Sequence, residues 1–366
     1  MLNIYHFLTW GTFWLMLLSS VFLLTVAVPK RQDLKSYKQM RYLLALGIFL
    51  FMAIANFIEL TTDESGIWDS RIITLWIGCC LAPLFTIINI TLINPHFLTI
   101  KKIIKPLILP LLFTGINFGI LVRFTARSQF FMAAYTAFVI FYVFIVIKYT
   151  LLFLKNYKEY GIRHNNYYSD PGAYHLKWVI VTQFIATGSG LMALVNLFMP
   201  AWGMCLFALF LNIFYPYYAI RFINYAFHFP TIAPVMDEIQ MEPVNNEQTF
   251  QIKTAVKGWE GQKMFLQSNL TIEVVARELG TNRTYLSTYL NTTKGKNFRE
   301  WISDLRIIEA QQLLIAEPEA LVNDIGLRVG FSDKGNFSNK FTQSTGVSPS
   351  IWRKTHLRHK QTETAC

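Results

Sequence analysis

The first part of this chain consists mostly of long segments without charged side chains, and this feature limits its fold more than any other. A helix needs about 20 apolar residues to cross the roughly 30 Å hydrocarbon core of a bilayer. Seven segments meet this requirement, and Glu59 is the one charged residue among them. They are Phe7–Val28, Tyr42–Leu60, Ile72–Ile93, Pro106–Val122, Phe130–Ile147, Trp178–Met199 and Met204–Ile220. The sequence therefore predicts a bundle of seven transmembrane helices.

The charged residues are unevenly distributed as well as few. They make up 15% of the chain, whereas soluble globular proteins carry about 25%. Residues 1–220 hold 23 charged side chains, and residues 250–360 hold 16 Lys or Arg and 10 Asp or Glu, a balance of +6. This distribution argues against an ordinary cytosolic enzyme. It predicts a lipid-soluble half joined to a basic, water-soluble half.

The loops between the predicted spans indicate the orientation of the bundle. Every second loop, beginning with residues 29–41, is rich in Lys and Arg, whereas the other loops carry only Arg71, Arg123 and Arg127. Basic loops stay on the cytoplasmic side of a membrane. We therefore expect the N-terminus outside and the basic half inside. The first segment lacks a basic region before it, so we expect a retained span and not a cleaved signal peptide.

Polar side chains interrupt several spans, and such groups are costly in hydrocarbon unless they face other helices or a cavity. They are Asn56, Glu59, Asn89, Asn117, Gln183, Asn196 and Asn212. For the amides we favour hydrogen bonds between helices. Asn56 and Glu59 are three residues apart and share one face near the outer end of the second span. They are the candidate stimulus-sensing residues, and the alternative for Glu59 is an ion pair with Arg71.

The composition suggests four regions along the chain. Residues 229–249 contain three Pro and four acidic residues but no Lys or Arg, which is typical of a short acidic connector. We therefore expect a transmembrane domain over 1–228, a linker over 229–249, a soluble domain over 250–358 and a tail over 359–366. An amphipathic helix around Phe250–Phe265 should begin the soluble domain, with Trp259 on its buried side.

Residues 271–291 have the pattern of a helix-turn-helix. Apolar residues recur at the i, i+3, i+4 and i+7 positions of one helix face. They are Ile272, Val275, Ala276 and Leu279. Gly280 is expected to end this helix, and Asn282 to cap a second helix. Ala276 is small enough to let the two helices cross closely.

The same unit recurs over residues 321–343, with one more residue after the turn. Val322, Ile325 and Val329 repeat the apolar face, and Gly330 takes the place of the turn glycine. Ser332 is the expected cap of the second helix. A long helix over Phe298–Ile315 lies between the units, and its Trp301, Leu305 and Ile308 are expected to hold them together. The sequence thus predicts an all-α protein, with a seven-span bundle followed by a soluble domain of two helix-turn-helix units.

Three stretches of the basic half carry a family resemblance. They read GTNRTYLS, LRIIEAQQLL and VGFSDKGNFSNKFTQSTGVSPSIWR. With them, residues 250–356 resemble the DNA-binding domain of AraC-type (arabinose-operon regulator) transcription factors. The resemblance implies two units that read adjacent segments of the major groove of double-stranded promoter DNA. It says nothing about the stimulus. The barrel-shaped ligand domain of some relatives is replaced here by the predicted membrane bundle.

The outward faces of the two second helices, together with nearby basic side chains, form the expected DNA-binding surface. Its members are Asn282, Arg283, Thr284, Ser287, Thr288, Asn291, Lys294, Lys296, Lys334, Asn336, Asn339 and Lys340. The resemblance assigns base-reading positions to Thr284, Ser287, Thr288, Lys334, Asn336 and Asn339. Lys294, Lys296 and Arg299 are expected to meet phosphates. Gly326 replaces a usual Ala, at a cost of about 1 kcal/mol in helix propensity.

These patterns favour a membrane-embedded, sequence-specific transcription regulator in the inner membrane of a bacterium, with its DNA-binding domain in the cytoplasm. No catalytic residue, metal site or cofactor is predicted. Expected partners are promoter DNA and the lipid bilayer, and further candidates are RNA polymerase, an unknown stimulus and a second copy of the chain. One alternative is a transporter or channel whose helix-turn-helix domain is only a scaffold. Another is release of the basic half by proteolysis in the linker.

Overall fold

The computed structural model describes residues 2–29, 31–61, 67–123, 128–170, 176–196, 199–237 and 246–364. Over these ranges the regular elements are helices, with one isolated antiparallel bridge between Tyr168 and Thr271. The expected all-α class is therefore confirmed. The chain divides into two compact units. The first, the bundle unit, comprises Met1–Tyr160 and Leu176–Met236, and the second, the C-terminal unit, comprises Gly161–His175 and Asp237–Cys366.

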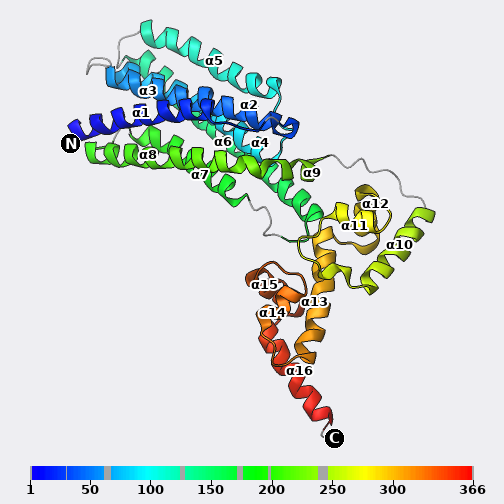
Figure 1. Ribbon diagram of the computed structural model, residues 1–366. Helices are drawn as coiled ribbons and strands as arrows, with labels where there is room; N and C mark the ends of the chain where they lie inside the picture. Colours follow the sequence, from blue (N-terminus) through cyan, green and yellow to red (C-terminus); the bar gives the residue numbers. More distant parts are fainter. Residues whose placement is uncertain are drawn as a thin grey trace. The chain divides into compact units, whose positions relative to one another are not determined.

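Long helices build the bundle unit, and Figure 1 shows them lying side by side. They are α1 (Leu2–Thr25), α2 (Lys35–Leu44), α3 (Leu50–Thr61), α4 (Ile67–Ile93), α5 (Ile100–Arg123), α6 (Gln129–Tyr167), α7 (Lys177–Asn196) and α8 (Ala201–Asn224). A π-helical stretch, Ala45–Phe49, joins α2 to α3 without a break. Two single 3-10 turns and the short helix α9 (Ala233–Met236) follow α8, and Ile232 and Val235 are buried there.

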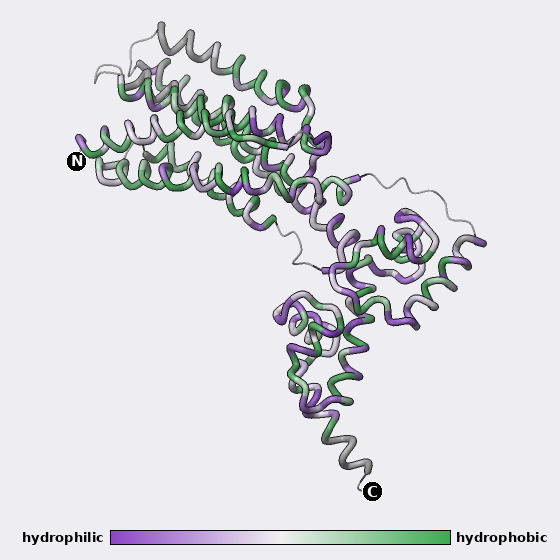
Figure 2. Tube along the Cα trace, in the orientation of Figure 1, coloured by the Kyte–Doolittle hydropathy of each residue, from purple (hydrophilic) through white to green (hydrophobic). Residues whose placement is uncertain are grey.

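Six helical stretches among the described residues are long and apolar enough to cross a membrane. They are Asn3–Thr25, Gln32–Thr61, Trp76–Ile93, Met132–Tyr167, Lys177–Val195 and Ala201–Phe227. The remaining predicted span, Pro106–Val122, is helical within α5 but is not one of these six. Apolar side chains such as Phe7, Ile140 and Ile213 are exposed on the bundle helices, and Figure 2 shows apolar residues along most of their length. Length and composition thus suggest association with a membrane.

A polar network joins three helices in the bundle core. Asn89 of α4 donates from Nδ2 to Gln183 Oε1 of α7 at 2.9 Å, and Tyr218 of α8 donates to Asn89 Oδ1 at 2.7 Å. Gln183 in turn donates from Nε2 to Thr86 Oγ1 at 3.1 Å. All four side chains are buried. For Asn89 and Gln183 the expected hydrogen bonds between helices are therefore confirmed, whereas the side chains of Asn117 and Asn196 lie outside the described residues.

The C-terminal unit contains the two expected helix pairs and the helix between them. Its helices are α10 (Asn246–Gly261), α11 (Ile272–Glu278), α12 (Arg283–Tyr289), α13 (Phe298–Ala316), α14 (Val322–Arg328), α15 (Lys334–Thr345) and α16 (Pro349–Thr364). In Figure 1, α11 and α12 lie beside one end of α13, and α14 and α15 beside the other. Asn297 and Glu300 form a reciprocal cap at the start of α13, which satisfies two backbone N–H groups that would otherwise lack acceptors.

Two apolar contacts with α13 stand out, one from α10 and one from the second helix pair. Trp259 of α10 is buried as expected, and its ring centroid lies 5.3 Å from that of Trp301. The second core is formed by Ile307, Ala310, Leu314, Ile325, Val329, Phe331, Phe337 and Phe341. Ile308 does not hold the units together, because its side chain is 53% exposed. The neighbouring positions Ile307 and Ala310 of α13 point into the core instead.

Candidate nucleic-acid interface

The two helix-turn-helix units share the same backbone geometry at their turns. Gly280 and Gly330 follow α11 and α14 with positive φ angles of 66° and 97°, which glycine adopts at little cost. The N–H of Thr281 donates to the carbonyl of Ala276 at 2.9 Å, and that of Phe331 to the carbonyl of Gly326 at 3.0 Å. Equivalent hydrogen bonds therefore close both turns and set the crossing of the helices.

The second helix of each pair is capped by a side chain, but one cap differs from expectation. Asn282 Oδ1 accepts the N–H of Tyr285 at 2.9 Å at the start of α12, as predicted. At the start of α15 the cap is Asp333, whose Oδ1 accepts the N–H of Asn336 at 2.7 Å. The prediction of Ser332 was wrong because the turn is one residue longer in this unit. Asp333, and not Ser332, therefore holds the extended backbone conformation before the helix.

Gly326 has a packing reason that the sequence did not reveal. A Cβ atom at this position would lie 2.6 Å from Cδ1 of Phe337, closer than any ordinary contact. In the first unit the equivalent residue is Ala276, which is buried. The α14–α15 crossing thus leaves no room for a methyl group where the α11–α12 crossing does. The helix-propensity cost of the glycine is offset by this closer packing.

The predicted base-reading face of α12 is largely covered. The Arg283 side chain is 13% exposed, and its Nη1 lies 3.9 Å from Glu273 Oε1. Burial lowers the pKa of Arg283 below its ordinary value, and the Glu273 carboxylate opposes this effect. Ser287 is buried and accepts a long hydrogen bond, 3.4 Å, from Asn291 Nδ2. Thr284 and Thr288 are half-buried.

The corresponding face of α15 is more exposed than that of α12. Lys334 and Asn339 are exposed, and Asn336 and Lys340 are half-buried. Lys340 Nζ donates to Gln343 Oε1 at 3.1 Å on the same helix. Lys and Asn are suited to the hydrogen-bonding groups at the edges of guanine and adenine in the major groove. The side chains predicted to read bases are therefore accessible on this helix in the conformation described.

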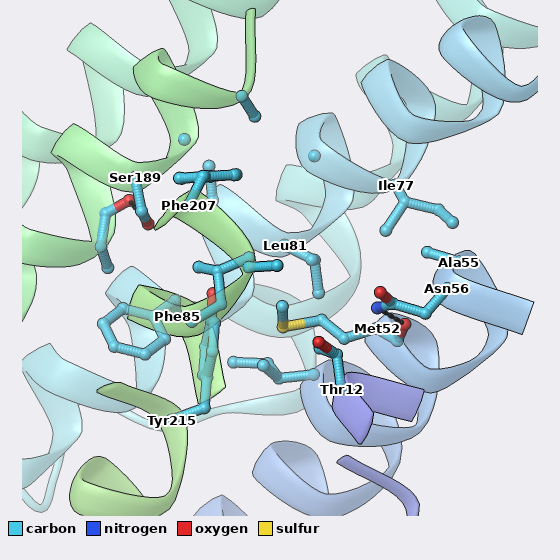
Figure 3. Close-up of a pocket in the computed structure, with 18 of the residues that line it drawn as sticks. Thr12, Met52, Ala55, Asn56, Ile77, Leu81, Phe85, Ser189, Phe207 and Tyr215 are labelled. Atoms are coloured by element: carbon cyan, nitrogen blue, oxygen red, sulfur yellow. Dashed lines mark hydrogen bonds between the residues drawn. The ribbon is translucent and has the colours of Figure 1, made fainter. Parts of the chain in front are cut away.

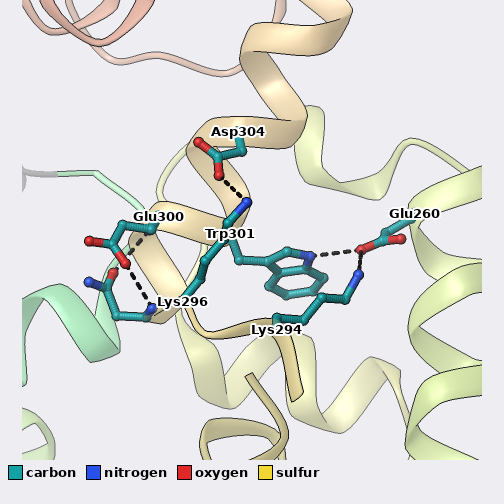
Figure 4. Close-up of polar contacts among 7 residues, drawn as sticks. Glu260, Lys294, Lys296, Glu300, Trp301 and Asp304 are labelled. Carbon is teal, nitrogen blue, oxygen red and sulfur yellow. Dashed lines mark hydrogen bonds and ion pairs between the residues drawn. The ribbon is translucent and has the colours of Figure 1, made fainter. Parts of the chain in front are cut away.

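Two lysines that were expected to meet phosphates form ion pairs near the start of α13 (Figure 4). Lys294 Nζ lies 3.0 Å from Glu260 Oε1, which also accepts the indole N–H of Trp301 at 2.7 Å. Lys296 Nζ lies 2.6 Å from Asp304 Oδ2, and the Lys296 side chain is 47% exposed. An exposed pair such as that of Lys296 contributes about 1 kcal/mol or less, so a DNA phosphate can replace the Asp304 carboxylate at small cost.

A cavity of about 540 Å³ lies within the bundle unit, and both predicted sensing residues line it. Figure 3 shows Asn56 beside Met52 and Thr12, with Leu81, Phe85 and Phe207 also around the cavity. Asn56 Nδ2 donates to the Met52 carbonyl at 2.8 Å. Tyr5 donates its hydroxyl hydrogen to Glu59. The alternative pairing of Glu59 with Arg71 concerns a side chain outside the described residues.

The described residues contain no group of three or more His, Cys, Asp or Glu side chains that could hold a metal ion. The buried Cys79 and Cys80 are free thiols in the bundle core.

Comparisons with known proteins place the C-terminal unit in a family. A family model described as "Helix-turn-helix domain" matches residues 275–355. The virulence regulon transcriptional activator VirF of Yersinia enterocolitica is 30% identical over 115 residues, which are 31% of this chain and 38% of VirF. The transcriptional activator RhaR of Salmonella dublin is 28% identical over 95 residues, 26% of this chain and 33% of RhaR. The C-terminal domain is an AraC-type helix-turn-helix domain.

The AraC-type domain belongs to a family of DNA-binding transcription regulators, not enzymes. The regulator YobQ of Bacillus subtilis, itself uncharacterised, is 32% identical over 96 residues, 26% of this chain and 39% of YobQ. A solved structure, the C-terminal domain of the response regulator AraT from Geobacillus stearothermophilus, is 30% identical and covers 32% of this chain and 88% of that domain, with a TM-score of 0.26. The chain spans less than two fifths of the length of the three curated relatives named here.

Proposed function

We propose that this chain is a membrane-bound transcription regulator that binds specific promoter DNA through α12 and α15. One observation carries the proposal: the same chain contains an AraC-type domain and six helices suited to a bilayer. In the AraC-type domain, Lys334 and Asn339 of α15 are exposed. Two such helices in one domain can enter successive major grooves about 34 Å apart. The seven-span topology, with the N-terminus outside and the AraC-type domain in the cytoplasm, completes the proposal.

The side chains of α15 supply the expected sequence preference. Lys334 suits the O6 and N7 acceptors of guanine, and Asn336 and Asn339 suit the N6 and N7 groups of adenine. Lys294 and Lys296 add phosphate contacts, which position the protein but carry no sequence information.

Selection of DNA sites tests this function on the full chain. The protein in lipid nanodiscs is incubated with a random duplex library at 150 mM salt, and the bound sequences are read. We expect sites that contain a preferred element for α15, and Lys334→Ala should relax the preference at one position within that element. Binding that depends on salt but not on sequence would contradict the proposal and would favour the scaffold alternative.

We further propose that the bundle senses a small amphiphilic molecule in its cavity. Glu59 and Asn56 offer a polar end with hydrogen-bond acceptors, and Met52, Leu81 and Phe207 offer an apolar wall. Sites for small molecules are commonly concave and mostly apolar, with a few polar groups that fix orientation. A molecule with a donor or cationic group and a hydrocarbon part fits this lining best.

Filling the cavity tests the sensing role without knowledge of the ligand. Ala193→Phe places a ring among the lining residues, and Ala133→Phe adds the same ring at an exposed position of α6 that does not line the cavity. Expression of a reporter gene behind the selected DNA site is measured at matched protein levels in the membrane. We expect Ala193→Phe to change the reporter output at least threefold and Ala133→Phe to leave it unchanged. Equal output from both variants would contradict the sensing role.

A further inference from the structure

We propose that residues 161–170 are a built-in ligand of the AraC-type domain that competes with DNA for Arg283 and Arg299. We call this stretch the docking segment. It comprises the last turns of α6 and the three residues after Tyr167, and it belongs to the C-terminal unit. The inference rests on the proposed DNA-binding function, because the docking segment occupies groups that this function requires.

A buried ion pair anchors the docking segment. Arg306 of α13 is fully buried and Asp170 is 1% exposed, and Arg306 Nη1 lies 3.4 Å from Asp170 Oδ2. Arg306 also donates from Nε to the Phe265 carbonyl at 2.9 Å and from Nη2 to the Gln267 carbonyl at 2.5 Å. Burial lowers the pKa of Arg306, and the Asp170 carboxylate opposes this effect. A buried guanidinium is tolerated where a countercharge and hydrogen-bond acceptors surround it.

The Asp170 carboxylate connects both helix-turn-helix units. Its Oδ2 accepts the N–H of Asn269, two residues before the cap of α11, at 3.3 Å. Its Oδ1 accepts the hydroxyl of Ser332, just before the cap of α15, also at 3.3 Å. The side chain that sequence analysis assigned to capping α15 therefore binds the docking segment instead. One carboxylate thus contacts α13, the residue two before the cap of α11 and the turn of the second unit.

Backbone hydrogen bonding aligns the docking segment with the start of the first unit. The N–H of Ser169 donates to the carbonyl of Leu270 at 2.9 Å. Tyr168 and Thr271 form an antiparallel bridge, and Thr271 is the residue whose side chain caps α11. This pairing fixes the register of the docking segment, so that Tyr167 and the residues before it lie beside α11 and α12.

The docking segment holds the first residue of α12. Tyr167 donates its hydroxyl hydrogen to Glu273 Oε2 at 2.9 Å, and Glu273 also pairs with Arg283. The guanidinium carbon of Arg283 lies 4.8 Å from the centroid of the Tyr167 ring, within the range of a cation–π interaction. Arg283 is therefore held between the Glu273 carboxylate and the Tyr167 ring. An acceptor group of DNA would have to take the place of these two partners.

A second arginine on the same side is held in the same way. Arg299 of α13, expected to meet a phosphate, donates from Nη1 to Asn165 Oδ1. Its Nη2 lies 3.3 Å from His164 Nδ1, and the His164 side chain is buried. The α15 face, by contrast, has Lys334 and Asn339 exposed. Among the predicted DNA-binding side chains, the docking segment thus contacts Arg283 of the first unit and Arg299 of α13.

Competition follows because a guanidinium cannot hold these partners and a DNA phosphate in one geometry. DNA that engages the first unit must displace the docking segment. The apparent DNA affinity therefore rises by the same factor as the fraction of molecules whose docking segment is displaced. Helix α6 is continuous into the docking segment, and its residues up to Tyr160 belong to the bundle unit. A change in α6 is therefore the expected input to this competition.

The test measures binding of the full chain in lipid nanodiscs to the selected DNA site by fluorescence anisotropy. The double variant Asn165→Ala with Tyr167→Ala removes the Asn165 hydrogen bond to Arg299 and the Tyr167 ring beneath Arg283, and leaves His164 and Glu273 in place. Asn156→Ala is the matched control, because its side chain binds the Leu152 carbonyl of its own helix in the bundle unit. We expect the double variant to bind about tenfold more tightly, and the slope of log K against log salt to become steeper by about 1.8 for two added phosphate contacts.

A cross-link provides a second readout that does not depend on truncated side chains. Tyr168→Cys with Thr271→Cys places two cysteines at bridged positions, where Cα atoms lie within reach of a disulfide. We expect the oxidised protein to bind the DNA site at least tenfold more weakly than the same protein after reduction.

Unchanged affinity in the double variant, together with equal affinity before and after reduction, would overturn the inference. If every protein lacks sequence-specific binding, the proposed function fails as well. If the wild-type chain binds its site specifically, but neither the double variant nor oxidation of the cysteine pair changes the DNA affinity, the inference alone fails.

Discussion

Helices α12 and α15 are equivalent elements of one domain, yet their first residues differ in exposure. Arg283 at the start of α12 is 13% exposed and held by Glu273 and Tyr167. Lys334 at the start of α15 is exposed. The turns that precede the two helices have the same hydrogen bonds and the same positive-φ glycine. The lower exposure of Arg283 therefore arises in part outside the repeated unit, from Tyr167 in residues 161–170, and in part from Glu273 of α11.

This comparison indicates that two copies of one structural motif can differ in the exposure of equivalent residues within a single conformation. On the proposed account, the second unit reads bases in the conformation described, whereas the first must exchange its internal partners for DNA. A domain with one available and one withheld unit has intermediate affinity for a two-part site. Release of the withheld unit then raises that affinity without creating any new DNA-binding residue, which is an economical form of regulation.

The largest effect is expected at the ion pair that anchors the docking segment. Asp170→Asn removes the countercharge of the fully buried Arg306, and breaking a buried pair in this way costs about 3–5 kcal/mol. Thermal unfolding of the full chain, followed by tryptophan fluorescence, measures the loss. The matched change Asp304→Asn breaks an exposed pair with Lys296 and should cost about 1 kcal/mol or less. Similar losses in the two variants would show that Asp170 is not an anchor.

The next effect concerns the tighter helix crossing of the second unit. Gly326→Ala puts a methyl group 2.6 Å from the Phe337 ring, and overpacking of this kind costs about 1–3 kcal/mol. Gly258→Ala, at an exposed position of α10 with open space around it, should instead stabilise by about 0.5–1 kcal/mol. Denaturant unfolding distinguishes the two signs. A stabilising Gly326→Ala would mean that the crossing is looser than described.

DNA affinity should respond more to α15 than to α12 in the wild-type chain. Lys334→Ala is expected to cost about 1–3 kcal/mol of binding free energy at its base pair, whereas Thr284→Ala should have a smaller effect. In the Asn165→Ala, Tyr167→Ala background, the effect of Thr284→Ala should grow, because α12 is then available. A double-mutant cycle measures this coupling. Equal effects of Thr284→Ala in the two backgrounds would contradict the asymmetry.

The smallest effect is expected at the phosphate-binding lysines. Lys296→Ala should weaken binding to all DNA sequences uniformly and reduce the salt slope by about 0.9. The loss of its exposed pair with Asp304 should leave stability nearly unchanged. Titrations at several salt concentrations check both statements. A change in sequence preference would show that Lys296 contacts a base and not the backbone.

The local structure of the DNA-binding domain could be predicted from the sequence, because its signals are short-range. Apolar spacing located α11, and Gly280 and Asn282 marked the turn and the cap that the structure contains. The mistaken cap at Ser332 arose from the one-residue difference in turn length. Ile308 was assigned to the wrong face of α13, because several faces of that helix carry apolar residues.

The docking segment could not be predicted, because its contacts join residues far apart in the chain. Asp170 and Arg306 are separated by 136 residues, and neither has neighbours whose spacing indicates a partner. In the sequence, residues 148–177 between the fifth and sixth predicted spans count only as one of the basic segments that indicate orientation. That pattern predicts orientation in a membrane and does not indicate which side chains a loop contacts. The cavity could be predicted only in part: the sequence indicates Asn56 and Glu59 as polar residues on one face of a span, but not the other residues that line it.

Hydroxyl-radical footprinting of the full chain in nanodiscs, on its selected site, tests the difference between the two units most directly. The half-site of α15 is first identified as the one whose sequence preference changes in Lys334→Ala. The account predicts strong protection of that half-site and weak protection of the other in the wild-type chain, with both protected equally in the Asn165→Ala, Tyr167→Ala variant. Equal protection of both half-sites by the wild-type chain, unchanged in the variant, would contradict it.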